Sequence, residues 1–381
     1  MSFLKKKIGL DATCFNERAS GAKQRFISLY TELFKIMPKS KFYIFHAKDY
    51  NISKDIDISK YKNVSIVRTN IQSHNTLLNI IRAYFFWKKN LNKYKLDIFE
   101  IFRLPIFNKF KVKNILTIHD LRYLLLKYSG FKNIFNYLYC RIFLRNIDQF
   151  IVVSNFTKKE LQLKLNYRNI TVVENGIDLK KFQKIKKTKN IKLKSRLKLD
   201  DNFIFTVGHF ELRKNYKNLI LSIKKLQNKN IKLVIAGNAN TKTEIKFKKK
   251  LQNIIYENKL NYRIILLTNL NNEEIKLLYK NCKLFIFPSV YEGFGIPVLE
   301  AMAFNKKIIL SNIEPFKEIL KYNKKIFFDP KNPIDIARKI NLNIDKSNIK
   351  KNEYQKQLNF YKNKILAYKI YNLYFNLTKK K

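Results

Sequence analysis

Residues that turn or break a chain are scarce here, because 381 residues contain only eight Gly and seven Pro. The three Cys are isolated and the four His are scattered, a pattern that predicts neither a disulfide framework nor a zinc site. No apolar run approaches the roughly 18 residues that span a bilayer, and the basic N-terminus lacks the pattern of a signal peptide. We therefore expect reduced thiols, no bound metal, and a cytoplasmic protein that can also lie on the inner face of the membrane.

Acidic residues are also few: 28 Asp and Glu stand against 78 Lys and Arg, for a formal net charge of +50. A basic chain attracts nucleic-acid phosphates whatever their sequence, so a nucleic-acid-binding protein is one hypothesis. No stacking or groove-reading module accompanies the charge, and the wealth of Lys, Asn, Ile, Phe and Tyr is typical of AT-rich codons. We interpret the lysine-rich faces as solvated surface, and the alternative is attraction to an anionic membrane surface or a lipid-diphosphate acceptor.

The apolar pattern predicts an α/β fold throughout. Short apolar runs alternate with helical patterns in both halves of the chain, as in parallel sheets. Two successive series of similar size predict two Rossmann-like domains facing across a cleft. We place them at residues 1–185 and 186–352, with a charged linker near the boundary, and residues 353–381 carry a last helical pattern.

The scarce turn residues gather at one place in the second half. Four of them fall within ten positions, at Pro288, Gly293, Gly295 and Pro297. An apolar run before them predicts a buried strand, and the Pro of the segment PVLEAMAFN suits the first position of a helix. The backbone amides of the connecting loop and the positive helix end should then face a crevice.

Two carboxylates flank that loop, Glu292 within it and Glu300 in the first helical turn. Both can accept hydrogen bonds from ligand hydroxyls, as carboxylates do with ribose. A glutamate near a helix start is as readily a solvated cap that complements the helix dipole. We expect Glu292 to be a surface-loop carboxylate whose replacement by Ala leaves the fold intact.

At these residues the chain closely resembles the retaining glycosyltransferases of family 4, the group 1 class, whose signature pairs two Glu seven residues apart in EGFGxPxLEAMA. From Glu292 this chain reads EGFGIPVLEAMA. The resemblance implies that Glu292 contacts the donor sugar and Glu300 the nucleotide ribose. It also implies that the rest of the loop binds the donor, through Gly293, Phe294, Gly295 and Ile296. The family usually has Gly where this chain has Asn305, and Asn tolerates the left-handed turn expected there.

A second segment of the same half carries adjacent cations. Gly208 is followed by HFELRKN, which places Arg213 and Lys214 in a loop just before a helix. Such a pair can clamp a diphosphate, although taken alone it is more often solvated. The resembled family uses VGxxxxRKN to hold the nucleotide diphosphate and neutralise the leaving group. Arg213 and Lys214 would then replace a metal ion, so no cofactor is expected besides a UDP- or GDP-linked sugar.

In the first half, ILTIHD places His119 and Asp120 at the carboxyl end of an apolar strand, the edge where α/β sheets bind ligands. A lone His there is more often structural, but the resemblance implies that His119 faces the donor sugar. Asp120 could serve the acceptor hydroxyl, orient His119 or cap the next helix. Gly21, with Lys23 and Arg25 nearby, resembles the family's N-terminal glycine loop, which approaches the sugar diphosphate.

The resemblance therefore implies the GT-B architecture, with a C-terminal helix that crosses back to the first domain. It implies retaining transfer of a hexose-type sugar from a nucleotide diphosphate sugar to a glycan or lipid-linked acceptor, in cell-surface polysaccharide or lipopolysaccharide synthesis. No covalent nucleophile is assumed. The alternatives are a basic nucleic-acid-binding protein and a nucleotide-sugar epimerase of the same fold, which needs no acceptor.

Overall fold

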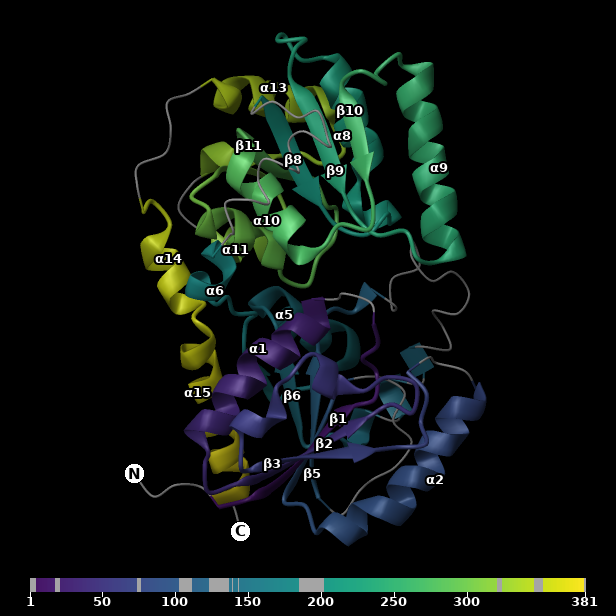
Figure 1. Cartoon of the computed structure of the whole chain (residues 1–381), viewed down its shortest axis with the longest axis vertical. Helices are drawn as coiled ribbons and strands as arrows, with labels where there is room; N and C mark the ends of the chain where they lie inside the picture. The colour runs from purple at the N-terminus through teal and green to yellow at the C-terminus, as the bar shows by residue number, and fades with distance from the viewer. Residues whose placement is uncertain are drawn as a thin grey trace. The chain divides into compact units, whose positions relative to one another are not determined.

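The chain forms two compact units, which we call the first unit (Met1–Gly176 with Tyr361–Lys381) and the second unit (Ile177–Phe360). In each unit a parallel sheet is covered by helices, as the α/β pattern predicts (Figure 1). This computed structural model describes residues 5–17, 21–73, 77–102, 112–122, 137–138, 140–142, 144–184, 202–320, 324–345 and 352–379.

The sheet of the first unit has seven strands in the order β3-β2-β1-β4-β5-β6-β7, all paired in parallel. Most of these strands are buried, which explains why they read as short unbroken apolar runs. Their bounds are β1 (Lys7–Ala12), β2 (Lys41–His46), β3 (Val64–Arg68), β4 (Ile98–Ile101), β5 (Lys113–Ile118), β6 (Gln149–Val152) and β7 (Ile170–Val172).

Helices cover both faces of this sheet. They are α1 (Gly21–Ile36), α2 (Leu77–Tyr94), α5 (Asn155–Leu165) and α15 (Asn363–Lys379), with short 3-10 turns at Ile52–Lys54, Ile58–Lys60 and Leu144–Asn146. Successive strand residues enter different cores: Ile98 packs with α1 and α15, whereas Phe99 packs with α2 and α5. Because side chains alternate along a strand, α1 and α15 lie on one face and α2 and α5 on the other.

The C-terminal helix returns to the first unit, as predicted. Figure 1 shows α15, in yellow, beside α1, in purple, and its buried residues Leu366 and Ile370 belong to the core that α1 also lines. The hydroxyls of Tyr374 on α15 and Tyr30 on α1 both donate to the buried carboxylate of Glu100 on β4. This shared acceptor ties the end of the chain to the first sheet.

Two details of the predicted organisation differ in the structure. The last helical pattern forms two helices rather than one, because α14 (Gln355–Phe360) stays in the second unit while α15 joins the first. The second unit begins at Ile177 rather than 186, because α6 (Leu179–Gln183) packs there: the ring of Phe182 lies 5.4 Å from that of Phe304. The predicted linker after residue 184 lies outside the described residues.

The sheet of the second unit has six parallel strands in the order β10-β9-β8-β11-β12-β13. The strands are β8 (Phe203–Val207), β9 (Lys232–Ala236), β10 (Ile264–Leu267), β11 (Leu284–Phe287), β12 (Lys307–Ser311) and β13 (Phe327–Phe328). The helices are α8 (Tyr216–Lys224), α9 (Lys242–Glu257), α10 (Asn272–Asn281), α11 (Ile296–Ala303), α12 (Glu314–Ile319) and α13 (Pro333–Ile344), with 3-10 turns at Leu212–Lys214 and Lys324–Ile326. The strand order reverses between β8 and β11, the position where open α/β sheets bind ligands.

Asparagine occupies most of the left-handed backbone positions that the described non-glycine residues adopt. Seven described non-glycine residues have a positive φ, and five of them are Asn, including Asn269 (58°) and Asn305 (51°). Asn305 therefore keeps the left-handed turn that the sequence predicts after α11. No helix in the described ranges combines the length and apolarity needed to cross a bilayer.

Candidate functional site

The loops that follow β8 and β11 meet at the carboxyl edge of the second sheet. The backbone amide of Val290 donates to the carbonyl of Arg213 at 2.8 Å, and the Asn215 side chain donates to the carbonyl of Pro288 at 3.1 Å. Asn215 has a left-handed φ of 56°, which ends the Leu212–Lys214 turn and opens α8. The reversal of strand order thus brings together two loops that lie far apart in the sequence.

At their junction Glu292 is held by three groups on one oxygen. Its Oε1 lies 2.6 Å from Lys214 Nζ and 2.7 Å from Arg213 Nη1, and it accepts a hydrogen bond from Ser289 Oγ at 2.8 Å. The side chain of Glu292 is only 11% exposed, so the expectation of a surface-loop carboxylate is wrong.

Charge and burial together fix the ionisation of this cluster. Burial alone would raise the pKa of Glu292, but Arg213 and Lys214 outweigh it and lower the pKa to about 2. Burial lowers the pKa of Lys214 to about 8, against the opposing attraction of Glu292. Both groups are therefore mostly charged at neutral pH, and Glu211 Oε2, 2.6 Å from Arg213 Nε, completes a set of two cations and two carboxylates.

Two of the scarce glycines are required by the backbone here. Gly208 has a φ of +153°, and a Cβ on it would lie 2.8 Å from Lys214 Cε. Gly295 has a φ of +129° and would place a Cβ 2.9 Å from the ring of Phe316. These positions strain any other residue, so the glycines maintain the loop shape and the space for Lys214.

The rest of the predicted donor loop leads into α11. Gly293 and Phe294 are buried, and Gly295 is the residue before the helix, which begins at Ile296. The helix therefore starts one residue before Pro297, the predicted first position. The loop lies between the Glu292 cluster and Glu300.

Glu300 has a different environment from Glu292. Its Oε2 accepts a hydrogen bond of 2.7 Å from the hydroxyl of Tyr279 on α10, a fully buried residue. Burial raises the pKa of Glu300 to about 7, although the Tyr279 bond acts in the opposite direction. Glu300 is therefore close to half-ionised at neutral pH.

Sequence reasoning missed Tyr279, Ser289 and Glu211. Tyr279 is one of 22 Tyr and lies 21 residues before its carboxylate partner, so nothing in the sequence distinguishes it. Glu211 had a signal, because it stands two residues before Arg213 in ELRKN. A buried Ser or Tyr hydroxyl usually has a hydrogen-bond partner, but that rule applies only once burial is known.

In the first unit His119 directly follows β5. Burial, helped by the cation of Arg25, lowers the pKa of His119 to about 3, so the ring is neutral at physiological pH. Asp120 accepts a hydrogen bond of 3.1 Å from the backbone amide of Arg122, and its three predicted roles remain predictions.

Gly21 is the first residue of α1, and residues 18–20 before it lie outside the described ranges. Lys23 Nζ donates to the hydroxyl of Tyr50 at 3.0 Å, and Arg25 Nη2 donates to the carbonyl of Val173 at 3.0 Å. Both cations are buried in the first unit. The predicted approach of this segment to the sugar diphosphate remains a prediction.

No group of three or more His, Cys, Asp or Glu in the described ranges is arranged to hold a metal ion. Two carboxylates at D-x-D spacing, Asp55 and Asp57, lie in the first unit and already have partners: Asp55 pairs with Lys23 at 3.4 Å and Asp57 with Lys60 at 2.9 Å. Metal-free operation remains a prediction.

Comparison with known proteins gives matches over both halves of the chain. A model of the glycosyl transferases group 1 matches residues 187–364, and a model of glycosyltransferase family 4 matches residues 30–181. An uncharacterized glycosyltransferase of Methanocaldococcus jannaschii is 32% identical over 188 residues, 49% of this chain and 46% of its own. A second one from that organism is 28% identical over 325 residues, covering 82% and 83% of the two chains.

The O-antigen chain mannosyltransferase RfbU of Salmonella typhimurium is 24% identical over 207 residues, 54% of each chain. This chain thus spans about half the length of RfbU and of the first relative from Methanocaldococcus.

Solved structures show the same fold. Sucrose-phosphate synthase of Thermosynechococcus elongatus gives a TM-score of 0.77 at 16% identity, covering 99% of this chain and 100% of its own. HepE of Anabaena, solved with UDP and glucose, gives a TM-score of 0.66 at 16% identity over 98% of each chain. These neighbours and the two parallel sheets identify the GT-B fold. The two family models, one on each half of the chain, support a group 1 glycosyltransferase.

Proposed function

We propose that this protein transfers a hexose-type sugar, with retention of the anomeric configuration and without a metal ion, from a UDP- or GDP-linked donor. The acceptor is a glycan or a lipid-linked glycan of cell-surface polysaccharide or lipopolysaccharide. The observation that carries the proposal is the pair Arg213 and Lys214, held by Glu292 where the second sheet reverses its strand order. Paired cations at such a position suit a diphosphate.

The two cations supply what the departing group needs. When the bond between the anomeric carbon and the diphosphate oxygen breaks, negative charge develops on the nucleoside diphosphate. Arg213 and Lys214 stabilise that charge from fixed positions, because Glu292, Glu211 and Ser289 hold their side chains and loops in place. The acceptor hydroxyl attacks from the face that the diphosphate leaves and gives its proton to the departing diphosphate oxygen, so no enzyme nucleophile is involved.

The two glutamates bind hydroxyl groups of the donor. Glu292, whose Oε1 is held by Lys214 and Ser289, accepts hydrogen bonds from the sugar through Oε2. Glu300 accepts from the nucleotide ribose through the oxygen that Tyr279 does not use. In the first unit His119, neutral at physiological pH, faces the sugar, and Asp120 serves the acceptor side.

The relatives support this proposal through what their names state. RfbU is described as an O-antigen chain mannosyltransferase, and HepE was solved with UDP and glucose. A nucleotide sugar and a surface glycan are therefore the substrates we propose for this chain, which would work in the cytoplasm at the inner face of the membrane.

The proposal is tested by offering the purified protein UDP-, GDP- and dTDP-sugars and following the anomeric protons by NMR. Slow hydrolysis of one donor, with the first-formed free sugar in the donor's own anomeric configuration, is the expected result. Release of the opposite anomer first would contradict retention. Conversion of the donor to another nucleotide sugar, without release of nucleoside diphosphate, would identify an epimerase instead.

A further inference from the structure

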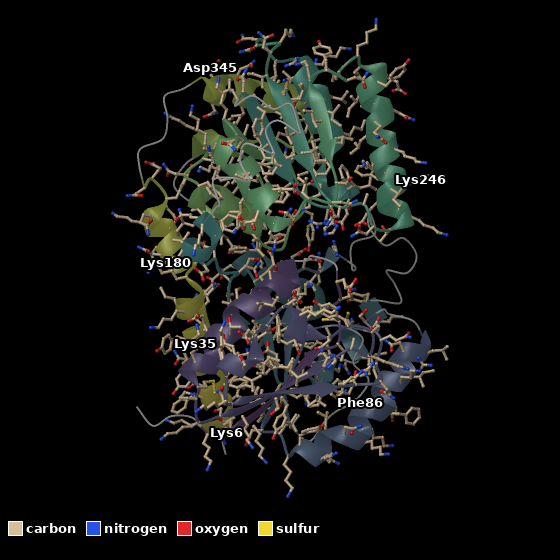
Figure 2. All side chains as sticks on the ribbon, viewed as in Figure 1. Lys6, Lys35, Phe86, Lys180, Lys246 and Asp345 are labelled. Carbon is tan, nitrogen blue, oxygen red and sulfur yellow. The ribbon has the colours of Figure 1, made fainter. Side chains whose placement is uncertain are left out.

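Lys214 is buried, unlike most of the lysines that the structure describes. It is 5% exposed, whereas Lys246 on α9, labelled in Figure 2, lies at the surface of the second unit. An ammonium group that leaves water needs partners that replace its hydration. Glu292 is one such partner, with Oε1 at 2.6 Å from Nζ.

An aromatic ring is a second partner of this ammonium. Lys214 Nζ lies over the ring of Phe287, 4.6 Å from the ring centroid. The face of an aromatic ring carries partial negative charge, so it attracts a cation within about 6 Å, and the attraction grows when water is excluded. Phe287 is fully buried at the end of β11, so this contact is a desolvated one.

The ring of Phe287 and the stem of the lysine are themselves held in place. The ring lies 5.2 Å from that of Phe316 on α12, which is also fully buried. The stem of Lys214 runs along the backbone of Gly208, where a Cβ would lie only 2.8 Å from Cε. The ring, the Gly208 backbone and the carboxylate of Glu292 therefore confine Lys214 together.

The ring adds attraction to the site without adding charge. The cluster around Glu292 already balances two cations against two carboxylates, so it carries no net charge when all four groups are ionised. A third carboxylate in place of the ring would make the cluster negative, and the cluster would then repel a diphosphate. A neutral ring holds the ammonium and leaves its charge for the ligand.

We propose that Phe287 is a positioning residue: the face of its ring holds the ammonium of Lys214 beside Glu292, where that ammonium meets the diphosphate of the donor. Without the ring, the lysine would keep the carboxylate but lose a partner that fixes its position. This inference rests on the proposed function, because it takes Lys214 to bind a diphosphate. The contact of ring and ammonium is measured without nucleotide, so the two proposals can fail separately.

The contact is tested by placing mono-, di- and trifluorinated phenylalanine at position 287 of the full-length protein. Each fluorine withdraws electrons from the ring face and weakens its attraction for a cation at nearly constant volume. In urea unfolding without nucleotide, each fluorine should lower the free energy of unfolding more in wild type than in Lys214→Met. The matched control Lys246→Met, at the exposed lysine, should keep the wild-type response. An equal response with and without Lys214 overturns the proposal.

The positioning role is tested by calorimetry with UDP or GDP and the matching monophosphate. Fluorination at position 287 should lower the preference for the diphosphate stepwise, by about threefold in total. Phe287→Leu, which removes the ring and keeps an apolar side chain, should lower it by at least as much. The control is the same fluorination at Phe328 on β13, a core residue that is 1% exposed, which should leave the preference unchanged. Near-ultraviolet circular dichroism shows whether each variant is folded.

The outcomes separate this inference from the proposed function. A preference that stays at the wild-type value in every variant at position 287 would overturn the positioning role alone. A loss of equal size on fluorination of Phe328 would also overturn it, since a general disturbance of the sheet would then be the cause. A wild type that binds no nucleoside diphosphate would contradict the proposed function and the role in binding with it, and the unfolding response would still decide whether the ring holds Lys214.

Discussion

The carboxylate of Glu300 should lower the free energy of unfolding at neutral and alkaline pH. Its pKa is about 7 in the folded chain against an ordinary value of 4.5, chiefly because of burial. The folded state therefore binds more protons than the unfolded state between these two values, and stability falls as pH rises through this window. Below pH 4.5 the carboxyl is protonated in both states and the cost disappears.

The size of the effect follows from the same shift. One pKa unit corresponds to about 1.4 kcal/mol, so the difference between the two values sets an upper limit of about 3 kcal/mol above pH 7. Glu300 is only partly buried, so water reduces the cost, and we expect about 1 to 3 kcal/mol. A site that retains such a carboxylate is expected to use it for binding.

The variant Glu300→Gln tests this directly, because Gln keeps an oxygen that accepts from Tyr279. Urea unfolding should give a free energy of unfolding about 1 to 3 kcal/mol above wild type at pH 8, and nearly the same value at pH 4.5. The control is Glu257→Gln, at an exposed glutamate at the end of α9, which should change neither value. A variant that is no more stable than wild type at pH 8 would refute this reasoning.

Three further predictions concern the same loops. Glu292→Ala should lower the rate of sugar transfer by about a hundredfold or more. It should also lower the free energy of unfolding in urea by about 3 kcal/mol, because the buried Lys214 loses a partner. Full activity would show that Glu292 is not part of the site. Gly208→Ala should raise the KM for the nucleotide sugar at least tenfold, since its Cβ would displace Lys214, and an unchanged KM would contradict that role. Tyr279→Phe removes a hydrogen bond that lowers the pKa of Glu300, so this carboxyl should ionise at a higher pH in the variant. Because the ionised carboxylate is the form that we expect to accept from the ribose, calorimetry should show nucleotide affinity rising at a higher pH than in wild type. Identical pH profiles would exclude Tyr279 as a positioning residue.

Much of the fold is readable in the sequence because parallel strands bury both faces. The apolar runs FYIF and FIF have no polar residue within them, and each lies in an expected strand. The division of the last helix was not predictable, because Tyr361 and Lys362 between α14 and α15 are neither Gly nor Pro. That break depends on which unit each half packs against, and packing partners are not encoded in local periodicity.

The candidate site was predictable in part, and for different reasons at each residue. Arg213, Lys214 and Glu292 are named by short motifs, yet their contact depends on β8 and β11 being neighbours, which spacing alone does not establish. The burial of Glu292 was missed because a loop of Gly and Pro reads as exposed, whereas here two cations and Ser289 surround one oxygen. The hydrogen bond from Tyr279 to Glu300 joins two helices and leaves no trace in either segment.

The central claim is that Arg213 and Lys214 bind the diphosphate of a nucleotide sugar, and calorimetry with nucleoside diphosphates and monophosphates tests it most directly. Wild type should bind UDP or GDP at least about tenfold more tightly than the matching monophosphate, because the second phosphate meets both cations. The variant Lys214→Met leaves Arg213 and Ser289 on Glu292 and should abolish most of that preference while remaining folded. An equal preference in variant and wild type, or a wild type that binds neither diphosphate, would contradict the account.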